Sequence, residues 1–321
     1  MTYTRRGLGQ LALAAAPAVG LLQPGVLRAA GKPNSLFNGV QIGVITYSYR
    51  TMPDQSAEAY LKYIVDSGVS AIELMGDPAE SYAGRPALPR RGGGRGQELT
   101  AEQRAEMQAA QKAVKDWRLS VSMDKFKALR KMYNDAGVSI YAVKIMSTNM
   151  SDPELEYVFN VAEALGCTHT TLELPTDEAQ LKRLGDMAAR RKIYAAYHTH
   201  AQGTMTAFDR AFELSPGNMA NVDLGHYVAG GNVGGSTLEF LERHHARISS
   251  FHLKDRQTPE NGAGNLPWGT GDTPIKEILK LVKKSGWKMP GSVELEYEIP
   301  EGSNPVAEVK KCVEYCKAAL A

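Results

Sequence analysis

Short apolar segments alternate with longer amphipathic segments from Val40 to the C-terminus. The short segments, such as VQIGVITYSY and ISSFHLKDR, are rich in the residues of buried strands. The longer ones, such as SAEAYLKYIVDSG, repeat apolar residues at helical spacing and end at glycine. The pattern predicts strands at residues 40–49, 70–76, 138–146, 168–175, 193–200, 219–228, 248–256 and 291–300.

A helical segment follows each predicted strand, including one long helical region over residues 100–136. Regular alternation of this kind indicates a parallel sheet with helical crossovers. Eight strand–helix units over roughly 280 residues fit a (β/α)₈ TIM barrel, which needs about 250. A doubly wound open sheet is the alternative, but no glycine-rich phosphate fingerprint follows an early strand. We therefore predict an α/β fold of the TIM-barrel type.

The last predicted strand, GSVELEYEIP, has carboxylates at alternate positions, namely Glu294, Glu296 and Glu298. Because alternate side chains share one face of a strand, the apolar residues between them suit the helix side. The three glutamates would then point into the barrel and rise toward its C-terminal mouth, where barrel active sites lie. Unpaired buried carboxylates are costly, so these acids need a cation, a metal or a proton.

Other polar side chains lie late on the preceding strands and would meet the glutamates at the same mouth. They are Glu173, His198, His200, Asp223, His226, His252, Lys254 and Asp255. Carboxylates and imidazoles together, without thiolates, suit Mn²⁺, Mg²⁺, Co²⁺ or Zn²⁺. Each residue alone is weak evidence, because a single histidine is more often a core residue, as we expect for His169. The joint occurrence at strand ends predicts a divalent metal site.

The segments LELP, AYHTHAQGTM, VDLGHYVAGG, FHLKDR and VELEYE resemble the xylose-isomerase-like barrels, the sugar phosphate isomerase/epimerase superfamily. The resemblance covers nearly all of the chain after residue 38, and the middle segments are especially similar to inosose dehydratases. It implies one bound metal ion, with Mn²⁺ preferred. The implied ligands are Glu173, Asp223, His252 and Glu296.

The same resemblance implies that Glu173 and Glu296 are also the catalytic acid/base pair. His226 would contact substrate and His198 would line the pocket. Lys254 is a further candidate for substrate binding, and Lys144 would bind a substrate oxygen or form a salt bridge on the helix side. The irregular segment at residues 77–97 departs from the small epimerases, so the resemblance does not extend to substrate identity.

A metal that holds a ketone and its neighbouring hydroxyl acidifies the adjacent C–H, and a carboxylate can then remove the proton to give an enediolate. Return of the proton gives an isomerase or epimerase, which is the function we expect first. Loss of a leaving group gives a lyase or dehydratase acting on a keto sugar, keto glycoside or inosose, which is the alternative. A non-catalytic carbohydrate-binding barrel is a remoter alternative.

The composition limits the classes of molecule that the protein is expected to bind. The net charge of +2 is too small to indicate nucleic acid, and 43% hydrophobic residues are ordinary for a globular protein. The absence of any histidine before His169 also argues against the apurinic endonucleases that share this barrel. We expect a small carbohydrate as partner, three unpaired cysteines and no nucleic acid; the oligomeric state is open.

The N-terminus predicts export. Arg5 and Arg6 precede a mildly apolar Ala/Leu/Gly segment, the layout of a twin-arginine signal peptide over about residues 1–30. Pro17 and Gly20 interrupt this segment, so we expect no membrane span in the mature protein. We predict a single barrel domain at 38–321, a periplasmic location, and a Gly/Arg/Pro-rich insertion at 77–97. Trp268 would stack on a sugar or anchor its loop.

Overall fold

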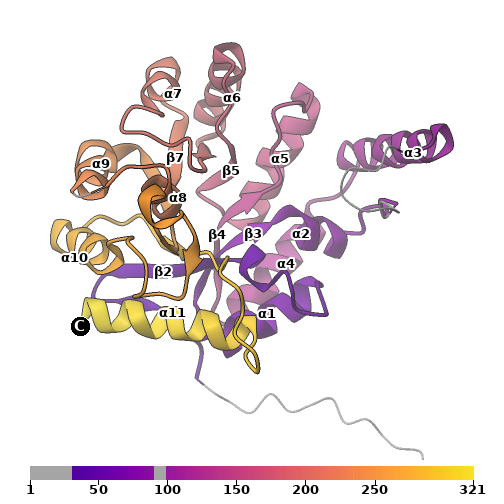
Figure 1. The fold of residues 1–321 in the computed structure, drawn as a ribbon. Coiled ribbons are helices and arrows are strands. Elements are labelled where there is room, and N and C mark those ends of the chain that lie inside the picture. The colour runs from indigo at the N-terminus through magenta and orange to yellow at the C-terminus, as the bar shows by residue number, and fades with distance from the viewer. Residues whose placement is uncertain (1–30, 90–98, 234) are drawn as a thin grey trace, which may run out of the picture. The chain divides into compact units, whose positions relative to one another are not determined.

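The computed structural model describes residues 31–89, 99–233 and 235–321 (Figure 1). The predicted signal peptide lies outside these residues, as does the part of the predicted insertion at residues 90–98. Lys32–Ala321 form one compact unit. No helix in the described part of the chain is long and apolar enough to cross a membrane.

Eight parallel strands of the described chain close into a barrel, which confirms the predicted fold. Around the barrel the order is β2-β11-β8-β7-β6-β5-β4-β3, and β3 pairs with β2 to close it. The strands are β2 (Val40–Ile45), β3 (Ala71–Met75), β4 (Ser139–Lys144), β5 (His169–Glu173), β6 (Tyr194–His198), β7 (Asn218–Asp223), β8 (Ile248–Leu253) and β11 (Gly291–Val293).

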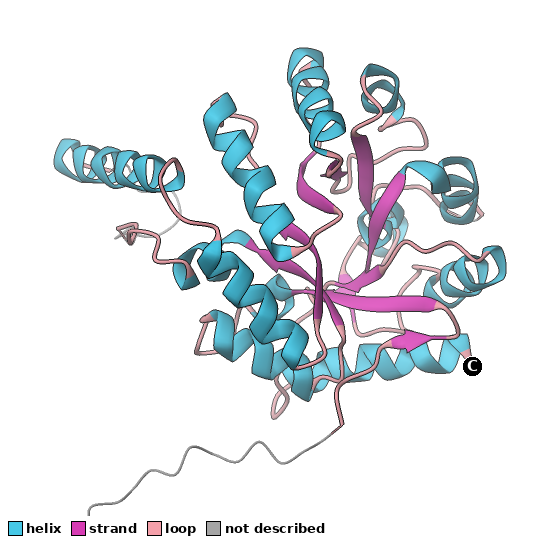
Figure 2. Ribbon diagram, turned by 180° about the vertical axis from the view of Figure 1, so that it is seen from behind, coloured by secondary structure: helices cyan, strands magenta, loops and turns pink. Residues whose placement is uncertain are grey.

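Helices surround the strands on the outside of the barrel (Figure 2). They are α1 (Ala57–Asp66), α2 (Gly76–Tyr82), α3 (Ala101–Arg118), α4 (Asp124–Asp135), α5 (Asp152–Leu165), α6 (Glu178–Arg191), α7 (Asp209–Leu214), α8 (Leu224–Ala229), α9 (Ser236–His244), α10 (Ile275–Ser285) and α11 (Pro305–Leu320). Buried apolar side chains of these helices and of the outward strand positions form the core between the two layers.

Smaller elements complete the described chain. Strand β1 (Leu36–Phe37) pairs with β2, and β9 (Asp255–Arg256) pairs with β10 (Asn265–Leu266) in the loop after β8. Single 3₁₀ turns lie at η1 (Thr46–Tyr49), η2 (His245–Arg247) and η3 (Pro259–Asn261). In the β10 loop, Trp268 packs edge-on against Tyr315, with ring centroids 5.8 Å apart. Of the two roles expected for Trp268, the structure supports the loop anchor.

Several predicted bounds were wrong in detail. The strand expected at 40–49 ends at Ile45, where η1 begins. The helical region expected over residues 100–136 is two helices, because α3 ends at Arg118 and α4 begins only at Asp124. The strand expected at 219–228 ends at Asp223, where α8 begins. The last strand, expected at 291–300, pairs only over Gly291–Val293, so its later residues lie outside the ladder. In each case the hydrophobic pattern in the sequence continues beyond the residue at which the helix or the strand ends.

The closed order places β5 and β11 on opposite sides of the barrel, because three strands separate them in either direction. Glu173 ends β5, and Glu294 directly follows β11. Since parallel strands end at the same mouth, carboxylates from these two strands approach it from opposite sides.

Candidate metal and sugar site

Four buried residues at the carboxyl ends of neighbouring strands point into one group. One nitrogen or oxygen atom from each lies within 4.8 Å of the others. They are His198 from β6, Asp223 from β7, His252 from β8 and Glu294 after β11. Two imidazoles and two carboxylates suit a divalent metal such as Mn²⁺, Co²⁺ or Zn²⁺. The described chain therefore contains a cluster that is compatible with such an ion.

Asp223 has one oxygen with a structural partner and one without. Its Oδ1 accepts a hydrogen bond of 2.6 Å from the backbone N–H of His226, which caps the N-terminus of α8. Its Oδ2 is buried and has no hydrogen-bond partner, although Lys254 Nζ lies 3.0 Å away. Burial raises the pKa of Asp223, and Lys254 opposes that rise. A buried carboxylate oxygen that accepts no hydrogen bond and already faces a positive charge fits a bound cation.

His252 lies between two carboxylates. Its Nδ1 is 2.9 Å from Glu294 Oε2, and its Nε2 is 2.7 Å from Glu73 Oε2. Burial alone would lower the pKa of His252, but the two carboxylates outweigh it and raise the pKa to about 10. In turn, His252 outweighs burial at Glu73 and lowers the pKa of that carboxyl to about 2. Each of the two ring nitrogens of His252 therefore contacts a carboxylate.

His198 is neutral and has one nitrogen occupied. Its Nδ1 lies 3.2 Å from Asn221 Oδ1, an acceptor, so Nδ1 carries the proton. Burial lowers the pKa of His198 to about 4. The lone pair of Nε2 is therefore available, which is the state a metal ligand requires.

Lys254 lies almost completely buried among the acids that follow β7 and β11. Its Nζ is 3.0 Å from Asp223, 2.8 Å from Glu294 and 2.7 Å from Glu296. Burial lowers the pKa of Lys254, but these three carboxylates outweigh it and raise the pKa. Lys254 and His252 likewise hold the pKa of Glu294 well below its usual range despite burial. One ammonium thus compensates several buried negative charges.

The DLGH segment brings α8 against the end of β8 through a glycine. A Cβ on Gly225 would lie 2.6 Å from the backbone oxygen of Lys254, so no side chain fits there. This close approach is what sets His226 beside Lys254, with 3.1 Å between Nε2 and Nζ. Arg256 Nη1 contacts the other ring nitrogen of His226. Burial, Lys254 and Arg256 together lower the pKa of His226 to about 2.

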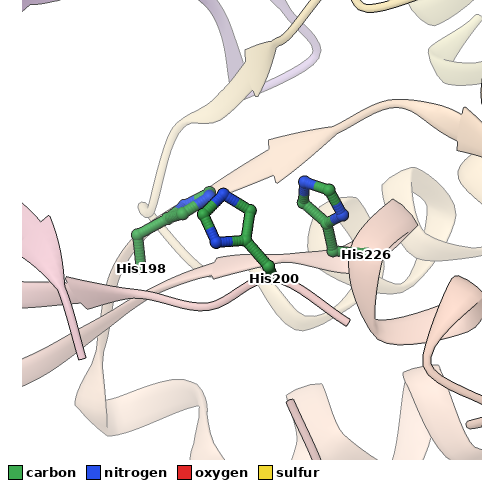
Figure 3. A group of neighbouring side chains, drawn as sticks. All are labelled: His198, His200 and His226. Atoms are coloured by element: carbon green, nitrogen blue, oxygen red, sulfur yellow. The ribbon is translucent and has the colours of Figure 1, made fainter. Parts of the chain in front are cut away.

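Three histidine rings gather at the mouth (Figure 3). The ring centroid of His200 lies 5.1 Å from that of His198 and 4.8 Å from that of His226. Their nitrogens also lie within 4.8 Å of one another. Both nitrogens of His226, however, contact cationic groups, which disfavours a second metal ion there. A group of imidazoles of this kind suits the hydroxyl groups of a ligand.

Glu173 lies at the edge of the site, with a side chain that is 51% exposed. Lys144 Nζ is 2.9 Å from its Oε1, and His200 Nδ1 is 3.4 Å from its Oε2. Burial of the inner part of the carboxyl raises its pKa, but Lys144 outweighs this and lowers the pKa of Glu173. Lys144 therefore forms an ion pair inside the mouth, across from the Glu296–Lys254 pair.

The structure brings Asp223 and His252, two of the four sequence-predicted ligands, into the buried group of four. Glu173 and Glu296 are not part of that group, and their assignment as ligands stays a prediction. The other two members of the group are Glu294 and His198. The sequence predicted that Glu294 points into the barrel but did not name it as a metal ligand. The position of Glu294 could have indicated this role, because it is the first acid after the strand and therefore nearest the ends of β7 and β8.

A family model described as xylose isomerase-like TIM barrel matches residues 61–319. The chain belongs to this family. No curated protein gives a significant sequence match to it. The family membership agrees with the predicted superfamily, and it makes a carbohydrate-processing enzyme the expected class.

Solved structures of the same fold include enzymes of different reaction types. The probable 3-DHS dehydratase AsbF from Bacillus anthracis has a TM-score of 0.58 and 14% identity, covering 86% of this chain and 98% of its own. D-psicose 3-epimerase with D-tagatose from Clostridium cellulolyticum H10 has a TM-score of 0.58 and 8% identity, covering 88% and 99%. The 3-keto-D-glucoside 4-epimerase YcjR from E. coli has a TM-score of 0.57 and 11% identity, covering 87% and 99%. At these identities the likeness shows the shared fold.

Proposed function

We propose that the protein is a divalent-metal-dependent epimerase or isomerase that moves a proton next to the carbonyl of a sugar. The observation that carries the proposal is the placement of carboxylates from β5 and β11 on opposite sides of the barrel, around a buried group of ligand-type residues. Two carboxylates that face a substrate from opposite sides can remove a proton from one face and return one to the other.

His198, Asp223, His252 and Glu294 would hold the metal. The Oδ2 of Asp223, which accepts no hydrogen bond, and the mixed imidazole–carboxylate set support this assignment. A divalent ion bound there would supply Lewis acidity to a carbonyl oxygen of the substrate. Mn²⁺ is the ion we expect, as the family resemblance implies.

Glu173 and Glu296 would act as the acid/base pair. Each carboxylate pairs with a lysine, Glu173 with Lys144 and Glu296 with Lys254. The pKa of Glu173 is lowered, so this carboxylate stays ionised near neutral pH and can accept a proton. At each site the lysine would stabilise the carboxylate charge when the proton leaves again. Both side chains are partly exposed, whereas the group of four is buried, so a ligand entering the mouth reaches these two first.

His200 would bind a hydroxyl group of the sugar beside His198, which lines the pocket, and His226 would bind one in exchange for its contact with Lys254 or Arg256. The support is the clustering of three imidazoles, with the pKa of two of them lowered so that they stay neutral. A neutral imidazole can donate one hydrogen bond and accept another, which matches a hydroxyl group. Lys144 and Lys254 would orient substrate oxygens from the two sides.

Elimination from a keto sugar, keto glycoside or inosose is the second candidate. Lys254 and Arg256 both contact His226, which places cationic donors beside the proposed hydroxyl-binding residue. Such donors can stabilise a leaving oxygen as well as hold a substrate hydroxyl. A dehydratase among the solved structures with this fold is consistent with either outcome.

The test is incubation in D₂O of metal-loaded protein with ketoses, 3-keto glycosides and inososes, followed by NMR. An epimerase with two opposed carboxylates should give an isomeric product that carries deuterium at the reacting carbon, because the returning proton comes from a different group. A lyase should give an unsaturated product with a new ultraviolet absorbance. Complete proton retention together with two metal ions per chain would instead indicate a hydride shift and would overturn the proposal.

We also propose that the protein is exported by the twin-arginine route to the periplasm. The support is the Arg5–Arg6 pair before an Ala/Leu segment. Few sugar phosphates are expected outside the cytoplasm, so a free sugar or glycoside is the preferred substrate. Fractionation of cells that express the chain with both arginines changed to lysine should show retention in the cytoplasm. Unchanged export of that variant would contradict the route.

A further inference from the structure

Glu73 on β3 is a buried acid that takes no part in the proposed proton transfer. Its side chain is fully buried inside the barrel. Its Oε1 accepts a hydrogen bond of 2.6 Å from Thr171 Oγ1, and its Oε2 accepts one of 3.3 Å from Asn221 Nδ2. The third partner is His252, whose Nε2 lies 2.7 Å from Oε2.

A charged residue at this depth is costly. Barrel interiors are usually filled by branched apolar side chains, and an ionised carboxylate without partners would be strongly destabilising. All of Glu73's partners here are placed on other strands, on β5, β7 and β8. A residue that serves only to fill the interior would not need so many convergent donors.

We propose that Glu73 is a positioning residue for the metal centre, because it would keep the proton of His252 on Nε2 when a divalent cation takes the place of the proton between Nδ1 and Glu294. This inference rests on the proposed function, in which His252 is a metal ligand. The chemistry is that of a carboxylate–histidine–metal triad, in which the outer carboxylate orients the ring and raises the basicity of the ligating nitrogen.

The two nitrogens of His252 face different surroundings. Nε2 faces Glu73, away from the other members of the group. Nδ1 faces that group, at 2.9 Å from Glu294 Oε2 and 3.8 Å from Asp223 Oδ2. Without a cation both ring nitrogens can donate to these carboxylates. A cation held by Glu294 and Asp223 would displace the proton of Nδ1, and Glu73 then selects the neutral tautomer whose N–H lies on Nε2 and whose lone pair lies on Nδ1.

Asn221 links this arrangement to the second imidazole of the group. Its Nδ2 donates to Glu73 and, at 2.6 Å, to Ser250 Oγ, which orients its Oδ1 toward His198 Nδ1. The same network therefore sets the tautomers of both histidines. His198 keeps its proton on Nδ1, and His252 keeps its proton on Nε2.

The test compares the metal affinity of the full chain with that of Glu73→Gln, by calorimetric titration of chelator-stripped protein with Mn²⁺. Loss of an outer carboxylate of this kind weakens metal binding by about 10–100-fold. Glu80→Gln is the matched control: Glu80 is also a buried glutamate, it pairs with Arg118 and Arg85, and it does not touch the group. We expect Glu80→Gln to bind Mn²⁺ like the wild type, even if it is less stable.

A second measurement needs no variant. Nitrogen-15 NMR of the Zn²⁺-loaded wild-type protein should show the ring proton of His252 on Nε2, and that proton should exchange slowly with solvent. A proton on Nδ1 would overturn the inference, as would equal affinities of wild type and Glu73→Gln. Failure of the wild type to bind any divalent ion would instead overturn the proposed function, and the role of Glu73 with it.

Discussion

The carboxylate of Glu294 lies 2.9 Å from Nδ1 of His252, whereas Glu296, two residues further on, pairs with Lys254 at 2.7 Å. Both glutamates contact Lys254, so the contact with His252 is what distinguishes Glu294 from Glu296. Glu294→Gln should lose most of its affinity for Mn²⁺, because the charged ligand is gone. Glu296→Gln should keep that affinity. Isothermal titration of both variants checks this, and the reverse order would restore Glu296 as the ligand.

The two oxygens of Asp223 have different roles, since Oδ1 caps α8 and Oδ2 would bind the metal. Asp223→Asn keeps an oxygen that can accept from His226 N–H and cap α8, but it removes the charge. We expect weak Mn²⁺ binding and, in chelator, a loss of stability that comes from the broken ion pair with Lys254 and is common to both Asp223 variants. Asp223→Ala also removes the cap, which costs about 1 kcal/mol. Urea unfolding of both variants measures the difference; equal stabilities would show that the cap contributes nothing.

Glu173 should be needed for turnover more than for metal binding. Glu173→Gln and Glu296→Gln should each lower kcat by about 10²–10⁴-fold, the usual effect of losing a positioned acid or base. In D₂O, each should also slow exchange of the substrate proton on one face. Should Glu173→Gln lose Mn²⁺ affinity as strongly as Glu294→Gln, Glu173 is a ligand, as the sequence predicted.

His169 should make the fold sensitive to acid. Burial lowers its pKa to about 4 from an ordinary 6.5, against a smaller opposing effect of Glu73. The unfolded chain therefore binds the extra proton first, and the free energy of unfolding should fall as pH drops from 6.5 toward 4. The loss from this one group by pH 4.5 is about 2–3 kcal/mol.

His169→Gln removes that contribution while leaving a group that can bond to Ser250. Urea unfolding in chelator at pH 7 and pH 4.5 should show a smaller loss of stability on acidification in the variant than in the wild type. Other buried histidines, including His198, are present in both proteins, so the difference isolates His169. Parallel losses in the two proteins would contradict the assigned pKa.

The sequence by itself determined the barrel and the class of its site. Strand and helix periodicities are local properties, and eight alternations leave few ways to bury every apolar face. Because parallel strands end at one mouth, the positions of Asp223 and His252 late on their strands were enough to predict that they converge.

Only the tertiary structure decided which glutamate joins them. Counting alternate positions works while a strand remains in its ladder, but β11 stops pairing at Val293, before the first of its three acids. Beyond that point the partners of each carboxylate depend on groups brought from other strands, on Lys254 for both glutamates and on His252 for Glu294. The contact between Glu73 and His252 spans 179 residues of chain, and no periodicity in the sequence carries information about a hydrogen bond across the barrel.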